Sequence, residues 1–157
     1  MKNSGSRGMA LERRINKCNL VYRQKKLALI EKIELGFKIT VHGTIPLKST
    51  VDYKGMVKRG DCAIGLAFDA KETKSTTSFP LSNIKSHQLE YLNYVGYVGG
   101  EAFFLIQFVS HDKDHGFLTP LHFINTYWNN PKGPKSIKYT AFDKKWLVPL
   151  DDYLKLL

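Results

Sequence analysis

One uncharged segment, residues 102–109 with the sequence AFFLIQFV, restricts the folds that are open to this chain. It is the most hydrophobic run in the sequence, and its length and aromatic content suit a central strand that is buried on both faces. A strand of that kind needs a covering layer on each side of its sheet. At 157 residues the chain is long enough for one such core and too short for two, so we expect a single domain over residues 1–157.

The segments around this strand predict a mixed arrangement of helices and strands. Helices are expected where apolar residues recur at intervals of three or four: from Met9 onward, with apolar positions continuing to Leu29, and over residues 81–95 and 120–128. Strands are expected over residues 36–41, around 51–53, and over 62–71 and 117–119, with a turn-rich stretch over 43–48. The order of these elements predicts an α/β domain with a mixed central sheet flanked by helices.

The charge of the chain is strongly positive and unevenly distributed. Lys and Arg number 24 against 14 Asp and Glu, which gives a net charge of +10. Residues 1–32 carry nine basic and two acidic side chains, and therefore +7 of this total. Residues 1–8 have the composition of a flexible basic arm. Such an excess indicates a polyanionic partner, either nucleic acid or an anionic membrane surface. The membrane reading is the weaker one, because the basic helix lacks a large aromatic-rich face.

Nothing in the sequence predicts a membrane span or an export signal. No apolar run approaches the roughly 18 to 20 residues that a span needs, and the first residues, MKNSGSRG, lack the apolar core of a signal peptide. Cys18 and Cys62 stand alone, without the spacing of a disulfide framework or a zinc site. We therefore expect a soluble protein of the reducing cytoplasm, with no membrane association.

A candidate metal site is suggested by Asp52 and, seventeen residues later, Asp69-Ala70-Lys71. Side chains alternate along a strand, so Asp69 and Lys71 share one face, and a hairpin would bring Asp52 alongside them. Two carboxylates at one point form an oxygen site for a hard cation such as Mg²⁺, and Lys71 would neutralise charge on a phosphate. This is the D…(D/E)xK pattern of restriction-endonuclease-like nucleases. The alternative is a structural salt bridge on a surface strand.

Two further polar residues have positions that bear on this site. Gln88 falls on the apolar stripe of the helix expected over residues 81–95, where a buried amide must find partners. It either bonds the neighbouring backbone or reaches the metal site. Glu12 lies on a polar strip of the first helix and is interpreted as a residue that supports the site.

Four stretches together resemble the RecU family of Holliday junction resolvases, also known as penicillin-binding-protein-related factors. They are RGM…E…IN…N from Arg7, STVDYKG from Ser49, FDAKET from Phe68 and TSFPLSNI…HQL from Thr77. The resemblance continues more weakly to Ile137 and so covers nearly the whole chain in order.

The resemblance implies a restriction-endonuclease-like core that assembles as a homodimer on branched DNA and nicks a four-way junction symmetrically, leaving 5′-phosphate ends. It implies Mg²⁺ as the cofactor, with Mn²⁺ as an alternative ion. The residues implied are Asp52, Asp69 and Lys71 for catalysis, Thr50, Asp52, Asp69 and Gln88 for the metal, and Arg7 for DNA. With the neighbouring basic residues Arg13, Arg14 and Lys17, Arg7 forms the expected DNA-binding region.

The chain departs from the family pattern at three points. Position 69 is Asp where the family usually has Glu, and the segment over about residues 35–48 is a shortened version of the stalk that enters the junction centre. The hairpin over residues 53–68 is longer than usual. Two alternatives stay open: a less selective nuclease of the same fold that cuts duplex or flap DNA, and a non-catalytic DNA-binding accessory protein for recombination in which only the basic surface matters.

Overall fold

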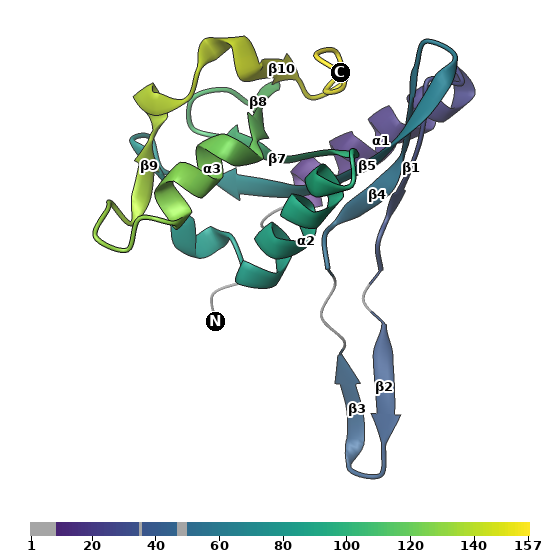
Figure 1. Ribbon diagram of the computed structural model, residues 1–157, viewed down its shortest axis with the longest axis horizontal. Helices are drawn as coiled ribbons and strands as arrows, with labels where there is room; N and C mark the ends of the chain where they lie inside the picture. The colour runs from purple at the N-terminus through teal and green to yellow at the C-terminus, as the bar shows by residue number, and fades with distance from the viewer. Residues whose placement is uncertain (1–8, 35, 47–49) are drawn as a thin grey trace.

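The structure is a computed structural model that describes residues 9–34, 36–46 and 50–157 (Figure 1). The arm expected at residues 1–8 lies outside the described residues. The α-helices are α1 (Met9–Gln24), α2 (Ser86–Tyr97) and α3 (Leu121–Trp128), and the 3₁₀ turns are η2 (Leu81–Asn83), η3 (Tyr139–Ala141) and η4 (Lys144–Trp146). The strands are β1 (Ala28–Lys32), β2 (Phe37–Thr40), β3 (Gly43–Pro46), β4 (Tyr53–Arg59), β5 (Cys62–Thr73), β6 (Ser78–Pro80), β7 (Glu101–Phe108), β8 (His115–Pro120), β9 (Ser136–Lys138) and β10 (Leu147–Pro149).

Six strands form the central sheet, in the order β1-β4-β5-β7-β8-β10. Strands β5 and β7 are parallel, and the other neighbouring pairs are antiparallel. The parallel pair is connected through η2 and α2, which provide the long crossover that parallel strands need. The prediction of an α/β fold with a mixed central sheet is confirmed.

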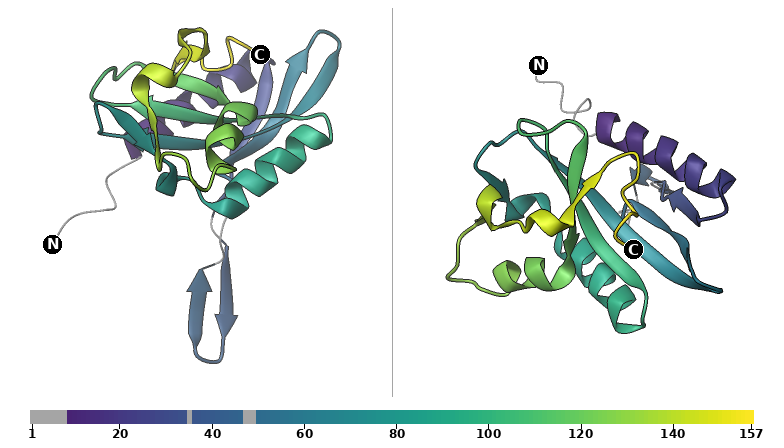
Figure 2. Two further views of the ribbon diagram at one scale, coloured as in Figure 1. Left: turned by 60° about the vertical axis from the view of Figure 1, so that its left-hand side comes forward. Right: turned by 90° about the horizontal axis from the view of Figure 1, so that it is seen from above.

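Helices cover both faces of this sheet (Figure 2). On one face α1 packs with the C-terminal segment around Phe68 and Tyr153, and on the other face α2 and α3 pack around Phe104 and Ile124. Strand β7 lies between the two layers, and every residue from Phe103 to Phe108 is buried. The prediction that this hydrophobic segment is a central strand covered on both sides is therefore confirmed.

The first helix ends earlier than its apolar pattern suggests. Lys26 adopts a left-handed conformation with φ of 57°, and the N–H of Leu27 donates to the carbonyl of Tyr22, as at the C-terminus of many helices. The chain then reverses into β1. Leu29, which was assigned to the helical pattern, lies in this strand and is exposed, so that assignment was wrong.

The β4–β5 hairpin depends on two glycines. Gly60 begins its two-residue turn with φ of +61°, a conformation that favours glycine. Gly55 lies against β1 so closely that a Cβ atom there would come within 2.0 Å of the Leu29 carbonyl oxygen. These two positions allow a long hairpin to lie flat beside β1.

Two local predictions were wrong. Residues 81–95 do not form one helix: η2 is separated from α2 by Ile84 and Lys85, and α2 continues to Tyr97. Residues 43–46 are not a turn but strand β3, which pairs with β2 from Phe37↔Pro46 to Thr40↔Gly43. Turn-forming residues at this position therefore belong to a short hairpin rather than to a loop.

The β2–β3 hairpin projects away from the central sheet (Figure 1). It occupies the region that the family resemblance assigns to the shortened stalk. Ile39 and Val41 near its tip are 83% and 95% exposed, although both are apolar. None of the described helices is long and apolar enough to cross a membrane.

Candidate active site

Two aspartates lie side by side at the base of the β4–β5 hairpin, Asp52 directly before β4 and Asp69 within β5. Tyr53 of β4 pairs with Phe68 of β5, which brings Asp52 beside Asp69. One carboxylate oxygen of Asp52 accepts a hydrogen bond of 3.1 Å from the backbone N–H of Ala70. The hairpin that the sequence spacing predicted is confirmed, and its ladder holds Asp52 next to the Asp69-Ala70-Lys71 segment.

Asp69 and Lys71 project from the same face of β5. Lys71 Nζ lies 2.5 Å from Asp69 Oδ1, and the Asp69 side chain is fully buried. This contact is an ion pair between a lysine ammonium and a buried carboxylate. A buried carboxylate is costly unless a cation lies close to it, and Lys71 supplies that charge.

The side chain of Gln88 closes the cluster from α2. Its Nε2 donates a 2.7 Å hydrogen bond to Asp69 Oδ2, and its Oε1 accepts one of 3.1 Å from Lys71 Nζ. The same Oε1 accepts from the backbone N–H of Lys85 at the start of the helix. Of the two interpretations of Gln88 given above, the structure favours contact with the acid cluster, with a backbone bond in addition.

Burial raises the pKa of Asp69 to about 7. The positive charge of Lys71 acts in the opposite direction, and the negative charge of Asp52 raises the pKa further. A carboxyl group with a pKa near neutrality inside a cluster of charges is typical of a functional site, although structural ion pairs also shift pKa values. Here burial is the main cause and the neighbouring Asp52 carboxylate adds to it, and a divalent cation would stabilise both ionised carboxylates.

An open cavity of about 560 Å³ adjoins this cluster, between β5, α1 and the η2–α2 connection. Lys71, Lys74 and Lys85 contribute positive charges to its lining, while Glu12 and Glu72 contribute negative ones. Lys71 therefore contacts the buried carboxylate of Asp69 and also lines a cavity that is open to solvent. The predictions from sequence did not include Lys74 or Lys85, because an isolated exposed lysine has no pattern that marks it as part of a site.

Glu12 lines the same cavity from the first turn of α1. Its carboxylate pairs with Lys32 Nζ at 2.5 Å, which ties α1 to β1. Glu12 is thus near the acid cluster but engaged with a lysine that the sequence analysis did not connect with it. Its supporting role stays a prediction.

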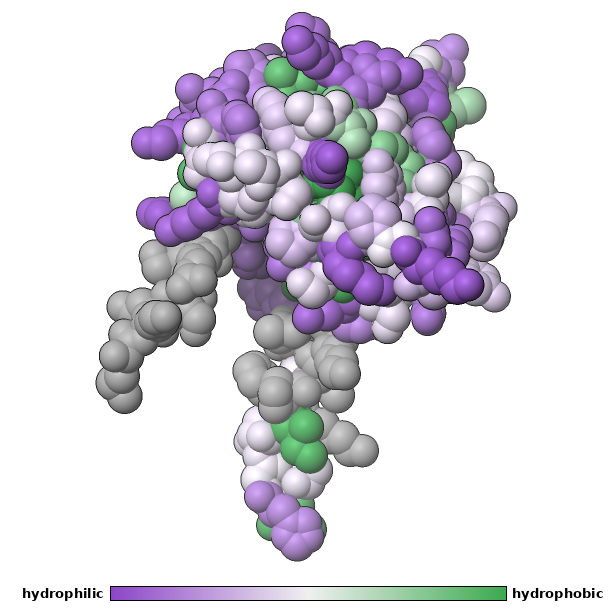
Figure 3. Space-filling view, turned by 90° about the vertical axis from the view of Figure 1, so that its left-hand side faces the viewer, coloured by the Kyte–Doolittle hydropathy of each residue, from purple (hydrophilic) through white to green (hydrophobic). Residues whose placement is uncertain are grey.

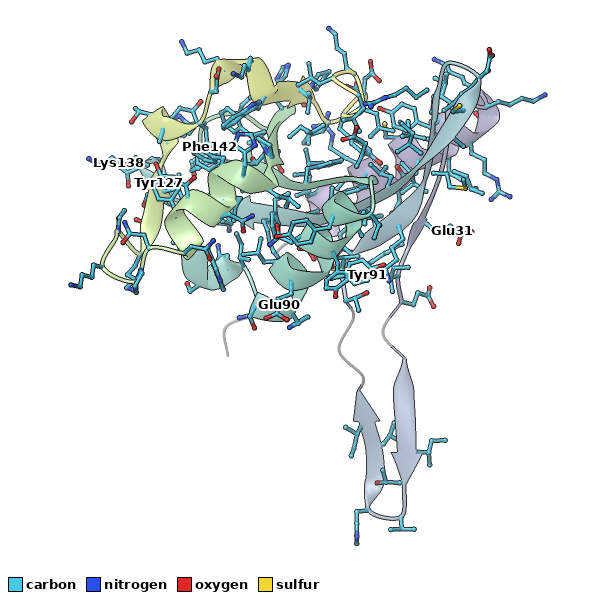
Figure 4. The ribbon with its side chains drawn as sticks, viewed as in Figure 1. Glu31, Glu90, Tyr91, Tyr127, Lys138 and Phe142 are labelled. Atoms are coloured by element: carbon cyan, nitrogen blue, oxygen red, sulfur yellow. The ribbon has the colours of Figure 1, made fainter. Side chains whose placement is uncertain are left out.

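Thr50 is exposed and lies apart from the cavity of Lys71. It lines a second hollow of about 740 Å³, together with His87 and Tyr91 of α2. Tyr91 faces the β4 side of α2, where Lys54 Nζ lies 4.2 Å from its ring centroid (Figure 4). No described contact joins Thr50 to Asp69, so its role as a metal ligand stays a prediction from the family resemblance.

The basic residues predicted to bind DNA lie on α1, apart from Arg7, which is outside the described residues. Lys17 and Arg13 are exposed, and Arg13 Nε donates to the carbonyl of Met9. Arg14 instead forms a 2.7 Å ion pair with Asp114, in the loop before β8. Part of the positive charge of α1 therefore stabilises the fold, and part remains free to bind an anion.

The oxygen atoms of the cluster fit a hard divalent cation. Asp69 Oδ1 is buried and contacts the cation Lys71, and Asp52 lies next to the Asp69-Ala70-Lys71 segment, so two neighbouring carboxylates supply oxygen ligands. Within the part of the chain that the structure describes, no group of three or more His, Cys, Asp or Glu side chains is suited to a metal. Two carboxylates are the usual number for Mg²⁺, which retains water ligands.

Two acids and a lysine at neighbouring strands of a mixed sheet, contacted by an amide from a covering helix, match the pattern of the D…(D/E)xK class of domain. This chain belongs to the RecU family, Recombination protein U, whose family model matches residues 6–156. Nucleases of this family generally depend on a divalent metal ion.

Three curated relatives illustrate the membership, and each is named Holliday junction resolvase RecU. The protein of Leuconostoc mesenteroides subsp. mesenteroides is 35% identical, over 92% of this chain and 74% of its own. That of Pediococcus pentosaceus is 34% identical (96% and 82%), and that of Shouchella clausii is 35% identical (96% and 79%). Among solved structures, the chain is similar to Hjc, a Holliday junction resolvase of Archaeoglobus fulgidus, with a TM-score of 0.48 and 14% identity over 89% of this chain and 97% of Hjc.

Proposed function

We propose that this protein is a Holliday junction-resolving endodeoxyribonuclease that acts in DNA recombination and repair. Its relatives that cover most of the chain bear the name of that activity. The observation that carries the proposal is the meeting of Asp52, Asp69 and Lys71 at one end of the β4–β5 hairpin, beside an open cavity. The reaction is the hydrolysis of one phosphodiester in each of two strands of a four-way junction, leaving 5′-phosphate ends.

The residues of the cluster have distinct roles in this reaction. Asp52 and Asp69 would hold Mg²⁺, or Mn²⁺ as an alternative ion, through their carboxylates, with Gln88 and Thr50 as further ligands by family resemblance. A divalent ion held there would supply an activated water molecule and neutralise charge on the phosphate. Lys71 turns from Asp69 toward the scissile phosphate and stabilises the negative charge that develops on its oxygens. Gln88 holds the side chains of Asp69 and Lys71 in fixed positions through one hydrogen bond to each.

The DNA is held mainly by its phosphates. Arg13, Arg14 and Lys17 supply positive charge on α1, the helix from which Glu12 lines the cavity, and Arg7 precedes them in the sequence. Contacts of this kind carry little sequence information, so selection depends on the shape of the branched substrate. A homodimer presents two such sites, one for each nick. We further propose that the protein acts in the cytoplasm, where a DNA substrate of recombination would be found.

The decisive experiment is cleavage of a synthetic four-way junction by the purified protein, with each of the four strands labelled in turn. We expect paired nicks at symmetrical positions in Mg²⁺, and their loss in Asp69→Asn with junction binding retained. Asp61→Asn is the matched control, since Asp61 is an exposed acid in the turn of the same hairpin. Full cleavage by Asp69→Asn would refute the site assignment.

The same assay separates the two alternatives. A flap and a linear duplex are digested beside the junction at equal concentration. Equal rates on all three substrates would identify a less selective nuclease of the same fold. Binding without cleavage in both Mg²⁺ and Mn²⁺ would identify a non-catalytic accessory protein.

A further inference from the structure

A third hollow, of about 460 Å³, lies close to the cavity of Lys71. Its lining comes from η2, from the end of α3 and from the loop between α3 and β9. Ser82 of η2 lines both this hollow and the cavity of Lys71, so the two adjoin at η2. The backbone N–H of Leu81 donates to the carbonyl of Lys135, which fixes this loop against η2.

Aromatic and proline side chains make up much of this hollow. Tyr127 and Trp128 close α3, and Pro131 and Pro134 come from the loop that follows. Tyr127 lies toward β9 in the view of Figure 4. Both aromatic residues are half-buried: they pack partly against the core beneath α3 and expose the rest of their surface to the hollow.

The charge around this hollow favours an anionic ligand. Lys135 lies in its lining, no acidic residue is among the described residues that form it, and the chain as a whole carries +10. Figure 3 views this side of the molecule and shows residues of intermediate hydropathy beside some hydrophobic ones, with hydrophilic residues around the edge. A volume of this size is within the range of small-ligand sites and accommodates a single nucleoside.

We propose that this hollow, formed around Tyr127 and Trp128, binds one unpaired nucleobase of the DNA, next to the phosphate held in the cavity of Lys71. The base stacks on the aromatic side chains, and Lys135 contacts a flanking phosphate. Ser82, which lines both hollows, lies between the bound base and the cavity of Lys71. The site accepts any base, because every base has an aromatic face. This inference rests on the proposed nuclease function for the position of the phosphate, but the stacking itself requires no catalysis.

The test uses tryptophan fluorescence in EDTA, so that no strand is cut. The chain has two tryptophans, and Trp146 lies outside the hollow, where it packs on Phe123. In Trp146→Phe only Trp128 emits, and we expect a short oligothymidylate to quench it in a saturable manner. In Trp128→Phe only Trp146 emits, and we expect little quenching. Equal quenching of the two variants would overturn the proposal. Quenching of Trp128 by a proline-rich peptide but not by oligothymidylate would also overturn it, because the hollow would then bind a peptide.

A second measurement does not depend on replacing a tryptophan. Tyr127→Leu in the Trp146→Phe background should raise the Kd for oligothymidylate about fivefold or more, as expected for a lost stacking partner. Tyr97→Leu is the control, since Tyr97 is an exposed tyrosine of α2 that lies outside this hollow. An unchanged Kd in Tyr127→Leu would overturn the stacking site. Junction cleavage is measured separately, so that a protein that stacks bases without cutting refutes only the nuclease assignment.

Discussion

Gln88 of α2 donates a 2.7 Å hydrogen bond to Asp69 of β5, a buried carboxylate 19 residues earlier in the chain. The other end of the amide accepts from Lys71. Since the amide has one donating and one accepting end, the acid and the cation together determine its orientation. Gln88 therefore connects the helix to the strand at the point where the two charges meet.

Gln88→Met should lower both stability and cleavage. The thioether fills a similar volume but cannot donate to Asp69, which leaves a buried carboxylate oxygen without its partner, at a cost of about 1–3 kcal/mol in the free energy of unfolding. We expect junction cleavage to fall as well, because Lys71 loses its acceptor. Urea unfolding and single-turnover cleavage measure the two effects. Gln24→Met, at an exposed glutamine of α1, should change neither.

The stability of the metal-free protein should fall as the pH rises from about 4 to about 7. Burial raises the pKa of Asp69 from its usual 3.8 to about 7, so in this range the folded chain holds a proton that the unfolded chain has released. The free energy of unfolding then decreases with pH, by an amount on the order of a few kcal/mol at most. Thermal unfolding in EDTA at several pH values measures the slope.

Two comparisons sharpen this pH test. Asp69→Asn should remove the slope, whereas Asp61→Asn should retain it. Mg²⁺ requires the ionised carboxylate and should therefore stabilise the wild-type protein more at pH 8 than at pH 5. A slope that is the same in Asp69→Asn would show that another group titrates.

Lys71→Met should abolish cleavage while leaving the metal site able to bind Mg²⁺. Lys71 pairs with Asp69, and its removal leaves the acids without a nearby cation, so the variant should be less stable in EDTA and gain more stability from Mg²⁺ than the wild type. Lys74→Met is the matched control, because Lys74 lines the same cavity. A mere two- or threefold loss of cleavage in Lys71→Met, equal to that of the control, would contradict the role proposed for Lys71.

The main features of the fold follow from the sequence. Residues 102–109 predict a covered central strand because no other arrangement buries so many adjacent apolar side chains, and β7 confirms this. The alternation along β5 and the spacing from Asp52 likewise predict the pairing of the acids, because strand geometry has a period of two. Both inferences rest on residue patterns within short stretches of the sequence, and such patterns can be read without knowledge of the tertiary structure.

Features that depend on contacts between distant segments could not be predicted. The end of α1 is set by a left-handed Lys26, a conformation for which lysine carries no signal. The pair of Glu12 with Lys32 depends on β1 lying beside α1, and strand β1 itself was hidden in the continuation of a helical pattern. Thr50 was implied as a metal ligand only by the family resemblance. In the structure it lines the same hollow as His87, apart from the cavity of Lys71.

Glu12→Gln tests whether this residue supports the site or only joins two elements. The ion pair with Lys32 is partly exposed and should contribute less than about 1 kcal/mol to stability. If Glu12 acts at the cavity, Glu12→Gln should slow cleavage more than Lys32→Met does, although both variants break the same pair. Equal rates in the two variants would limit Glu12 to a structural role.

Replacing residues 37–46 by a short Gly-Ser linker should leave the fold intact and reduce the preference for junctions. Strands β2 and β3 pair only with each other, outside the six-stranded sheet, so the change in melting temperature should be small. The exposed Ile39 and Val41 resemble the apolar wedges that other proteins insert between bases, and their loss removes that contact with the open centre of a junction. The measurement is the ratio of cleavage rates on a four-way junction and a linear duplex. Ile39→Ser with Val41→Ser should reproduce the fall in the ratio with the hairpin still present, and a ratio that is unchanged in both proteins would mean that junction selection lies in the body of the fold.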